Sequence, residues 1–412
     1  MKKFFFLLLL SFSAYPSNLE SWIEFQEKTS WQKLLKNLSP AGAKTGVVIA
    51  SPQRVNPDYF FHWVRDAALV MDVLMEENRM NPSAKLQKHI DQYIRFSHYI
   101  QTKDAISGLG EPKYFVDGRG YDGPWGRPQD DGPALRSLYI IRYAHDLLRQ
   151  GMKPSELEHL YKAELPAQSL IKRDLEYIAH RWTQPNFDLW EEVFGTHFYT
   201  LMAIRQALTE GAELAIIFND EAASAYYQWQ ASLVDERLQR FIQNNHFVNT
   251  IDFAGGLNYK HSNLDTSILL AFHHVGETSV FKLQDVKLKN TIGLLENAFT
   301  QVYPLNQRGI SAVALGRYPE DQYYGGNPWI LTTLAVAEYY YRLARQTNNL
   351  KLVEKGDAYL ERVYFHSRAD GAMAEQWDKF TGYHISADEL TWSHASFITA
   401  IRERKAAKKS LK

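Results

Sequence analysis

At two places in this sequence, a glutamate lies where its carboxyl group could act as an acid or a base. Glu191 and Glu192 follow a tryptophan in the run Asp188-Leu189-Trp190-Glu191-Glu192, and Glu375 opens the run Glu375-Gln376-Trp377-Asp378. Aromatic neighbours withdraw a carboxyl from water, which raises its pKa, and two adjacent like charges favour retention of a proton by one of them. Cleavage of a glycosidic bond needs one carboxylic acid that protonates the leaving oxygen and one carboxylate that activates water or attacks the sugar. The alternative is that Trp-Glu-Glu simply begins a helix, where the dipole favours acidic residues.

Other segments also place a charged residue within a few positions of Trp or Tyr. They cover residues 56–60, 63–66, 111–113, 125–128 and 316–321. This combination suits a sugar, because charged groups hydrogen-bond hydroxyls while aromatic faces stack on the apolar face of the ring. Spacing alone leaves simpler interpretations open: Arg65-Asp66 could be a structural ion pair, and Trp125 or Trp329 could belong to the core.

Composition removes several classes of protein. The 412 residues hold 46 Lys and Arg against 47 Asp and Glu, so no basic excess is available for nucleic acid or anionic membranes. Because 45% of the residues are hydrophobic, the chain can bury a core and is not expected to be disordered. The absence of cysteine excludes disulfides, thiolate zinc sites and a cysteine nucleophile. The 10 Trp, 24 Tyr and 22 Phe exceed what a core of this size usually needs.

Motifs for other chemistries are missing or stand in the wrong context. Residues 118–123 match GxGxxG, but no apolar strand precedes them and Pro124 and Pro128 prevent a helix from opening directly after them. We interpret this segment as a turn-rich loop. The histidines show no HExxH spacing, and the pair His273-His274 fits the core or the surface better than a metal site. We expect no metal and no cofactor.

The amino terminus has the pattern of an export signal. Two lysines precede an unbroken apolar stretch over residues 4–10, and small residues follow it. The stretch is shorter than the roughly 20 residues of a membrane-spanning helix. We therefore expect a signal peptide over residues 1–14 and a single domain over residues 15–412, exported to the periplasm or the medium. An apolar first helix packed in the core is the alternative.

Apolar residues recur with a helical period along nearly the whole chain, as in the stripe Ile171, Leu175, Ile178 and Trp182. The class expected is therefore all-α. About twelve helices are predicted, near residues 20–37, 62–77, 85–101, 133–150, 168–182, 197–210, 221–243, 264–274, 285–301, 328–347, 350–364 and 387–404.

Single residues mark some of the expected helix ends. Gly151 and Gly211 stand where helices should stop, because glycine readily adopts the left-handed conformation of a C-terminal cap. Ser386 with Glu389 has the spacing of a capping box at the start of the last helix.

The predicted links alternate in length. Those from odd to even helices span roughly 14–31 residues, whereas most of those from even to odd helices span about ten or fewer. In an array of alternately up and down helices, all odd-to-even links emerge at one end, which therefore carries the long loops on which binding residues usually lie. Twelve such helices fit a closed double ring of six pairs. An open solenoid is the alternative, although no repeat of 20–50 residues is found.

Several of these segments, taken together and in order, resemble the glucoamylase family of inverting glycoside hydrolases. The matching stretches are residues 51–52, 56–60, 63–66, 110–113, 125–129, 131–136, 188–193, 316–321, 326–329, 375–376 and 390–393. They extend from about residue 50 to residue 400. The resemblance implies an (α/α)6 barrel, a toroid that agrees with the double ring. It also implies release of β-glucose from the non-reducing ends of α-1,4-linked starch, glycogen or maltooligosaccharides.

The resemblance also assigns roles to residues of the matched segments. It implies that Glu191 is the general acid and that Glu375 is the general base that activates water. Inversion then predicts roughly 6.5–9.5 Å between the two carboxyls. The substrate-binding residues that it implies are Tyr59, Trp63, Arg65, Asp66, Trp125, Arg127, Glu192, Arg317 and Trp329. We expect an α-glucan partner, no nucleic acid, no membrane span and a monomer.

Some features depart from the family pattern. The sequence has no Ser/Thr-rich linker or starch-binding module after the last helix, and Asp130 stands where an arginine is familiar. Two alternatives remain: a related (α/α)6 hydrolase that acts on trehalose or dextran, and a non-catalytic glycan-binding protein on the same scaffold. The presence of both Glu191 and Glu375 argues against the second.

Overall fold

Twelve α-helices build the part of the chain that the computed structural model describes, which is residues 18–278, 280–310 and 312–411. They are α1 (Leu19–Lys36), α2 (Val64–Met80), α3 (Ala84–Gln101), α4 (Asp131–Arg149), α5 (Leu170–Arg181), α6 (Phe198–Ile217), α7 (Glu221–Leu238), α8 (Ser267–Val275), α9 (Val286–Val302), α10 (Ile330–Thr347), α11 (Leu350–Phe365) and α12 (Thr391–Ser410). No helix of these residues is long and apolar enough to cross a membrane. The predicted signal, residues 1–14, lies outside them.

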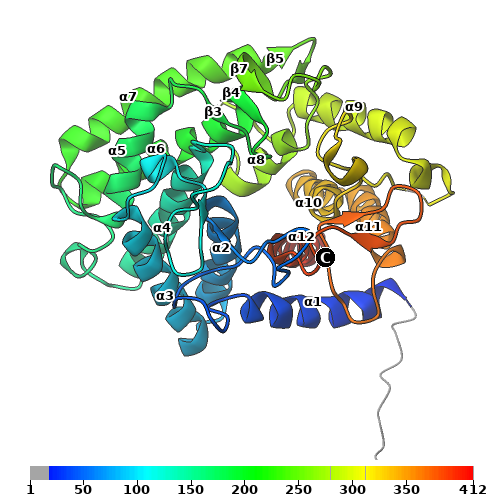
Figure 1. Ribbon diagram of the computed structural model, residues 1–412, viewed down its shortest axis with the longest axis horizontal. Helices are drawn as coiled ribbons and strands as arrows, with labels where there is room; N and C mark the ends of the chain where they lie inside the picture. Colours follow the sequence, from blue (N-terminus) through cyan, green and yellow to red (C-terminus); the bar gives the residue numbers. More distant parts are fainter. Residues whose placement is uncertain (1–17, 279, 311, 412) are drawn as a thin grey trace, which may run out of the picture.

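The even-numbered helices form an inner ring. Each of α2, α4, α6, α8 and α10 contacts the next even helix, and α12 contacts α2, so the ring is closed. Odd-numbered helices pack outside it, α1 against α12, α3 against α2, α7 against α6 and α11 against α10 (Figure 1). The predicted (α/α)6 barrel is confirmed, and the open solenoid is wrong.

Helix sequences follow from the two rings. An inner helix has neighbours on nearly every side, so α6 is buried along most of its length. An outer helix needs only one apolar face: in α5, Ile171, Leu175 and Ile178 are buried on the side toward the inner ring. The stripes found in the sequence are therefore the contacts between the rings.

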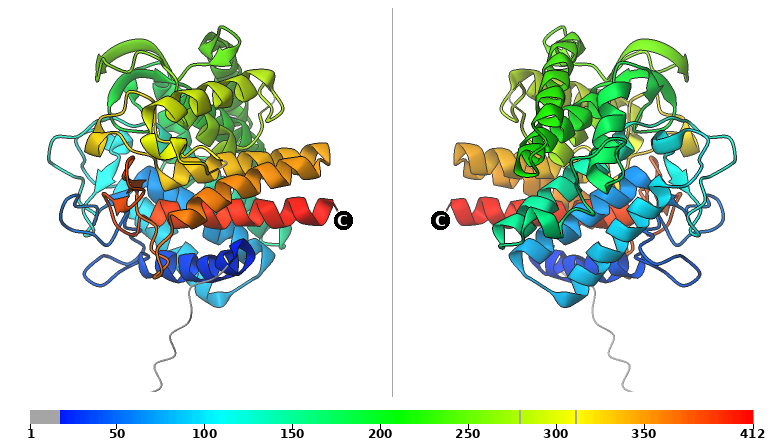
Figure 2. Two further views of the ribbon diagram at one scale, coloured as in Figure 1. Left: turned by 90° about the vertical axis from the view of Figure 1, so that its right-hand side faces the viewer. Right: turned by 90° about the vertical axis from the view of Figure 1, so that its left-hand side faces the viewer.

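The long connections lie at one end of the barrel, as predicted. Those that precede even-numbered helices cover residues 37–63, 102–130, 182–197, 239–266, 303–329 and 366–390. The left view of Figure 2 shows blue, cyan, yellow and orange connections gathered on the side opposite the C-terminal end of α12. At the other end α2–α3, α6–α7 and α10–α11 turn within a few residues. The link between α8 and α9 covers residues 276–285, and the link over residues 150–169 is the longest at this end.

Short antiparallel strands pair within these connections and, in β1–β2 and β4–β7, between two of them. β1 (His62–Trp63) pairs with β2 (Lys113–Tyr114), and β8 (Gln376–Trp377) with β9 (His384–Ile385). A three-stranded sheet has the order β3 (Asn186–Phe187), β4 (Val193–His197), β7 (Thr250–Gly256), and β5 (Ile242–Gln243) pairs with β6 (His246–Phe247). Apart from β4 and β7 each strand has two residues, which is too short for an alternating pattern in the sequence.

Two predicted helix signals are wrong. α6 continues through Gly211 to Ile217. The glycine serves the close packing of α5 on α6, because a Cβ at this position would lie 2.6 Å from Leu175 Cδ1. α12 begins at Thr391, and Ser386 and Glu389 both have left-handed backbone in the preceding loop. The stop at Gly151 is confirmed, with a φ of 99° directly after the C-cap of α4.

A buried ion pair between the rings yields a test of stability. Arg136 of α4 donates two hydrogen bonds of 2.7 Å to Asp174 of α5, and both side chains are buried. Arg136→Met leaves the Asp174 charge unpaired, which is expected to lower the free energy of unfolding by about 3–5 kcal/mol. The double variant Arg136→Met/Asp174→Leu removes both charges and should recover most of this loss. Urea unfolding of the three proteins measures both effects, and equal stability of the single variant and the wild type would contradict the expectation.

Candidate active site

A cavity of about 540 Å³ lies among the long connections. Ten of the expected residues line it: Tyr59, Trp63, Arg65, Asp66, Trp125, Glu191, Glu192, Arg317, Trp329 and Glu375. They come from segments between residues 59 and 375 that only the closed ring brings together.

Glu191 stands on a tight turn between β3 and β4, not at a helix start, so the helix alternative for Trp-Glu-Glu is wrong. Its backbone N–H donates to the Asp188 carbonyl at 2.8 Å, and its φ of 70° lies in the left-handed region. The indole of Trp125 donates to Oε2, and Arg65 Nη2 donates to Oε1 at 3.0 Å. The carboxyl is thus held by one group from the connection over residues 102–130 and one from the first turn of α2.

Glu375 precedes β8 and is held by its main chain. Its N–H donates to Ala387 at 2.9 Å, and its carbonyl accepts from Ile330, the first residue of α10. Burial raises the pKa of the Glu375 carboxyl to about 7, against the opposing effect of the Ser386 hydroxyl, which donates to Oε2. The raised pKa that we expected beside aromatic residues is confirmed for this carboxyl.

Arg65 distributes one positive charge over three carboxylates. Besides Glu191, its guanidinium is within 3.2 Å of Asp131 and 3.3 Å of Asp66. Burial raises the pKa of Asp66 to about 6, and the charge of Arg65 opposes this rise. Arg65-Asp66 is therefore an ion pair, as the simpler interpretation held, and it also lines the cavity.

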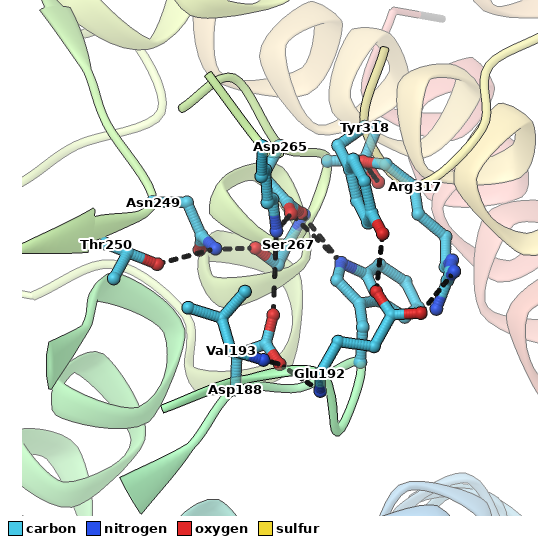
Figure 3. A network of polar contacts seen from close by, with 12 residues as sticks. Asp188, Glu192, Val193, Asn249, Thr250, Asp265, Ser267, Arg317 and Tyr318 are labelled. Carbon is cyan, nitrogen blue, oxygen red and sulfur yellow. Dashed lines mark hydrogen bonds and ion pairs between the residues drawn. The ribbon is translucent and has the colours of Figure 1, made fainter. Parts of the chain in front are cut away.

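Glu192 is held by residues of the connection that precedes α10. Arg317 Nη2 donates to Oε1 at 2.7 Å, and the Tyr318 hydroxyl donates to Oε2 at 2.6 Å (Figure 3). Arg317 also forms two hydrogen bonds with Asp321, at 2.6 and 2.8 Å. Burial raises the pKa of Glu192, and the charge of Arg317 opposes this effect. The adjacent glutamates thus point to different partners.

Aromatic rings form much of the remaining wall. The indole N–H groups of Trp63 and Trp329 have no hydrogen-bond acceptor among the described residues, although both side chains are buried. The Tyr59 hydroxyl lies 2.7 Å from that of Tyr323. Such a wall offers ring faces for stacking.

Lys113 occupies an aromatic cage in the same wall. Its ammonium lies 3.6 Å from the ring centre of Trp125, 4.2 Å from those of Phe61 and Tyr121, and 4.6 Å from that of Trp63. Burial lowers its pKa to about 8. The cation is held by ring faces, because cation–π attraction replaces part of the lost hydration.

Two residues singled out in the sequence lie elsewhere. Arg127 does not line the cavity, contrary to its expected role in binding. It pairs with Glu111 at 3.1 Å and donates to the carbonyls of Tyr121 and Gly123. These contacts brace the loop that carries Trp125. Asp130 is also outside, buried against the Tyr177 hydroxyl at 2.8 Å.

Several lining residues were not among the expected binding residues, namely Lys113, Tyr121, Trp190, Tyr323 and Trp392. Four of them belong to the connections that the sequence had marked as aromatic-rich, and Trp392 is the second residue of α12. Membership of a loop at this end is thus the signal that could have found most of them.

Of the histidine pair, which we expected in the core or at the surface, His273 is buried and His274 is half-buried. His273 Nε2 contacts the Ala335 carbonyl at 2.8 Å, and His274 Nδ1 contacts the Tyr199 hydroxyl at 2.7 Å. Within the described ranges no cluster of three or more His, Asp or Glu side chains is arranged to hold a metal ion.

An (α/α)6 barrel with two separately held carboxyls in one aromatic-lined cavity defines the class of α/α-barrel glycoside hydrolases. Residues 29–402 match the family described as "Glycosyl hydrolases family 15", and the chain belongs to this family.

Known relatives agree along nearly the whole length. The chain is 33% identical to Glucoamylase 1 of Rhizopus oryzae, over 95% of this chain and 72% of the relative. It is 31% identical to the probable glucoamylase of Schizosaccharomyces pombe, over 96% and 94% of the two chains. The solved structure of a glucoamylase from Saccharomycopsis fibuligera superimposes with a TM-score of 0.86 at 30% identity, covering 96% of this chain and 98% of that one.

The hydrogen bond from Ser386 to Glu375 yields a test by pH. The hydroxyl stabilises the ionised carboxylate, so Ser386→Ala should raise the pKa of Glu375 further. If Glu375 must be ionised for activity, kcat/KM falls as the pH drops through this pKa, and the variant should lose activity at a higher pH than the wild type.

The measurement is the acid limb of kcat/KM for maltose against pH. Ser393→Ala is the matched control, because Ser393 donates to the carbonyl of neighbouring Ala374 and not to the carboxyl. An acid limb that stays in place in Ser386→Ala would contradict the assignment.

Proposed function

We propose that this chain is an exo-acting, inverting glucan 1,4-α-glucosidase that releases β-D-glucose from the non-reducing ends of starch, glycogen and maltooligosaccharides. Membership of glycosyl hydrolase family 15 and the glucoamylase relatives support this activity. The observation that carries it is that Glu191 and Glu375, from two distant connections, line a single cavity.

In this mechanism Glu191 donates its proton to the glycosidic oxygen, and Glu375 takes a proton from the water that attacks the anomeric carbon from the opposite face. The hydrogen bonds to Glu375 support its role as the base. Ser386 and Gln376 both donate to Glu375 Oε2, which suits an ionised base. The role of Glu191 as the acid comes from its place in the segment of residues 188–193 that resembles the family.

Binding of the terminal glucose falls to the charged and aromatic lining. Arg65, Asp66 and Arg317 offer hydroxyl partners, and Glu192 would meet the next sugar. Tyr59 would flank the reacting carbon, with the rings of Trp63 and Trp125 packed beside the sugar and Glu191. Trp329 would contribute its ring to the wall. Exo action requires that the cavity accept a chain end and not its middle.

Replacement of either carboxyl tests the two roles. Glu191→Gln and Glu375→Gln keep the shape of the side chain and remove the acid or the base, which typically costs about 10²–10⁴-fold or more in rate. Glucose release from maltoheptaose should fall by that factor in both variants. The anomer first released by the wild type, followed by NMR, should be β.

Glu176→Gln is the matched control: this carboxyl accepts from Tyr227 on the outside of the barrel and should be dispensable. Full activity in either active-site variant would refute the assigned roles, and an α-anomer would refute inversion. Activity on trehalose without activity on maltoheptaose would favour the related trehalose-type hydrolase instead.

We further propose that residues 1–14 are an export signal and that residues 15–412 act as one catalytic domain and as a monomer. The order of basic, apolar and small residues supports the signal. Expression of the full chain in a bacterial host should give a mature protein whose N-terminal sequence begins near residue 15, outside the cytoplasm. Retention of Met1 in a cytoplasmic product would contradict export.

A further inference from the structure

Lys260 lies buried behind the wall of the active-site cavity, in the connection between β7 and α8. Its side chain is only 6% exposed, and its ammonium forms ion pairs with Asp265 and, at 3.5 Å, with Asp188. The same ammonium stands 4.2 Å from the ring centre of Tyr318. It does not line the cavity that holds the two glutamates.

Both carboxylate partners of Lys260 hold the turn that bears Glu191. Asp188 Oδ1 accepts the backbone N–H groups of Glu192 and Val193, at 2.8 and 3.0 Å (Figure 3). Asp265 accepts the indole N–H of Trp190, at 2.9 and 3.1 Å from its two oxygens. The residues on each side of Glu191 are therefore bonded to carboxylates that share one ammonium.

The third neighbour of Lys260 belongs to the connection that precedes α10. Tyr318, over whose ring the ammonium lies, donates its hydroxyl to Glu192 Oε2. Lys260 thus contacts three segments that are distant in sequence and meet around residues 190–192.

This turn needs such support. Glu191 has a φ of 70°, a conformation that a non-glycine residue holds only when its surroundings enforce it. Removal of the ammonium would leave the buried carboxylates of Asp188 and Asp265 without the cation that they share. Buried carboxylates in this state take up a proton or move. Either change alters the acceptors that fix the two residues flanking Glu191.

We propose that Lys260 is a positioning residue for the general acid: its buried ammonium, shared by Asp188 and Asp265 behind the cavity, fixes the Trp190–Glu192 turn that aims Glu191 at the glycosidic oxygen. The proposal rests on the function proposed above, in which Glu191 donates the proton.

The test compares a leaving group that needs the acid with one that does not. Maltose loses a sugar alkoxide, which must be protonated as it departs, whereas α-D-glucosyl fluoride loses fluoride, the conjugate base of a much stronger acid. In Lys260→Met, the ratio of kcat/KM for maltose to kcat/KM for the fluoride should fall about tenfold or more, because small displacements of a catalytic group have effects of this size. The ratio does not depend on how much of the preparation is folded.

The matched control is Lys172→Met at the far end of the barrel. Lys172 is also buried, with its ammonium 2.5 Å from Asp220 and 5.8 Å from the ring centre of Tyr161. Its loss should lower stability without changing the ratio. If Lys260→Met does not fold, Asp265→Asn keeps an acceptor for Trp190 and removes the charge facing Lys260, and the ratio should fall in the same direction.

Glu191→Gln separates failure of this proposal from failure of the proposed function. A selective loss on maltose in Glu191→Gln, with a wild-type ratio in the folded Lys260 or Asp265 variant, would overturn the role of Lys260 alone. An unchanged ratio in Glu191→Gln would overturn the acid role of Glu191, and the positioning role with it. A ratio that falls equally in Lys172→Met would show a general effect of stability and would also overturn the proposal.

Discussion

Closure of the inner ring, where α12 packs against α2, is the contact on which the active site depends. The last long connection meets the first there: Thr391 N–H donates to the Ala50 carbonyl at 2.8 Å, and Asp388 N–H donates to Gln53 at the same distance. Glu375 and Tyr59 share a cavity because these two connections are joined. Helix packing at a distance from the cavity therefore decides whether Glu191 and Glu375 line the same space.

The two arginines that line the cavity each pair with more than one acid. Arg65 serves three carboxylates, and Arg317 serves Glu192 and Asp321. The acidic groups of the lining outnumber its basic groups: they are Asp58, Asp66, Glu191, Glu192 and Glu375 against Arg65, Lys113 and Arg317. A surplus of acid favours the oxocarbenium-like transition state of glycoside cleavage, in which positive charge develops on the sugar.

Features of the fold that follow from the pattern of side chains along the chain could be predicted from the sequence. Features that depend on contacts between segments distant in sequence could not. The apolar period gave the helices and the link lengths gave their alternation, because both follow from burial on one or several faces. A helix end was wrongly predicted at Gly211, because the residue is small on account of its contact with Leu175, which lies on another helix. Arg127 was misplaced because its carbonyl partners depend on how the loop near Trp125 folds back. Lys260 carried no recognisable motif, since its two carboxylate partners lie in different segments.

Ring closure by α12 also sets the order in which the molecule can be assembled. A chain is synthesised from its N-terminus, and its domains begin to fold during synthesis. The turn of Glu191 is made halfway along the chain, but α2 keeps an uncovered apolar side until α12, near the end of the chain, reaches it. Contacts between such distant segments form slowly. The nascent chain therefore carries Glu191 without Glu375 for nearly half of its synthesis. With the roles proposed above, catalytic activity arises only after nearly all of the chain has been made.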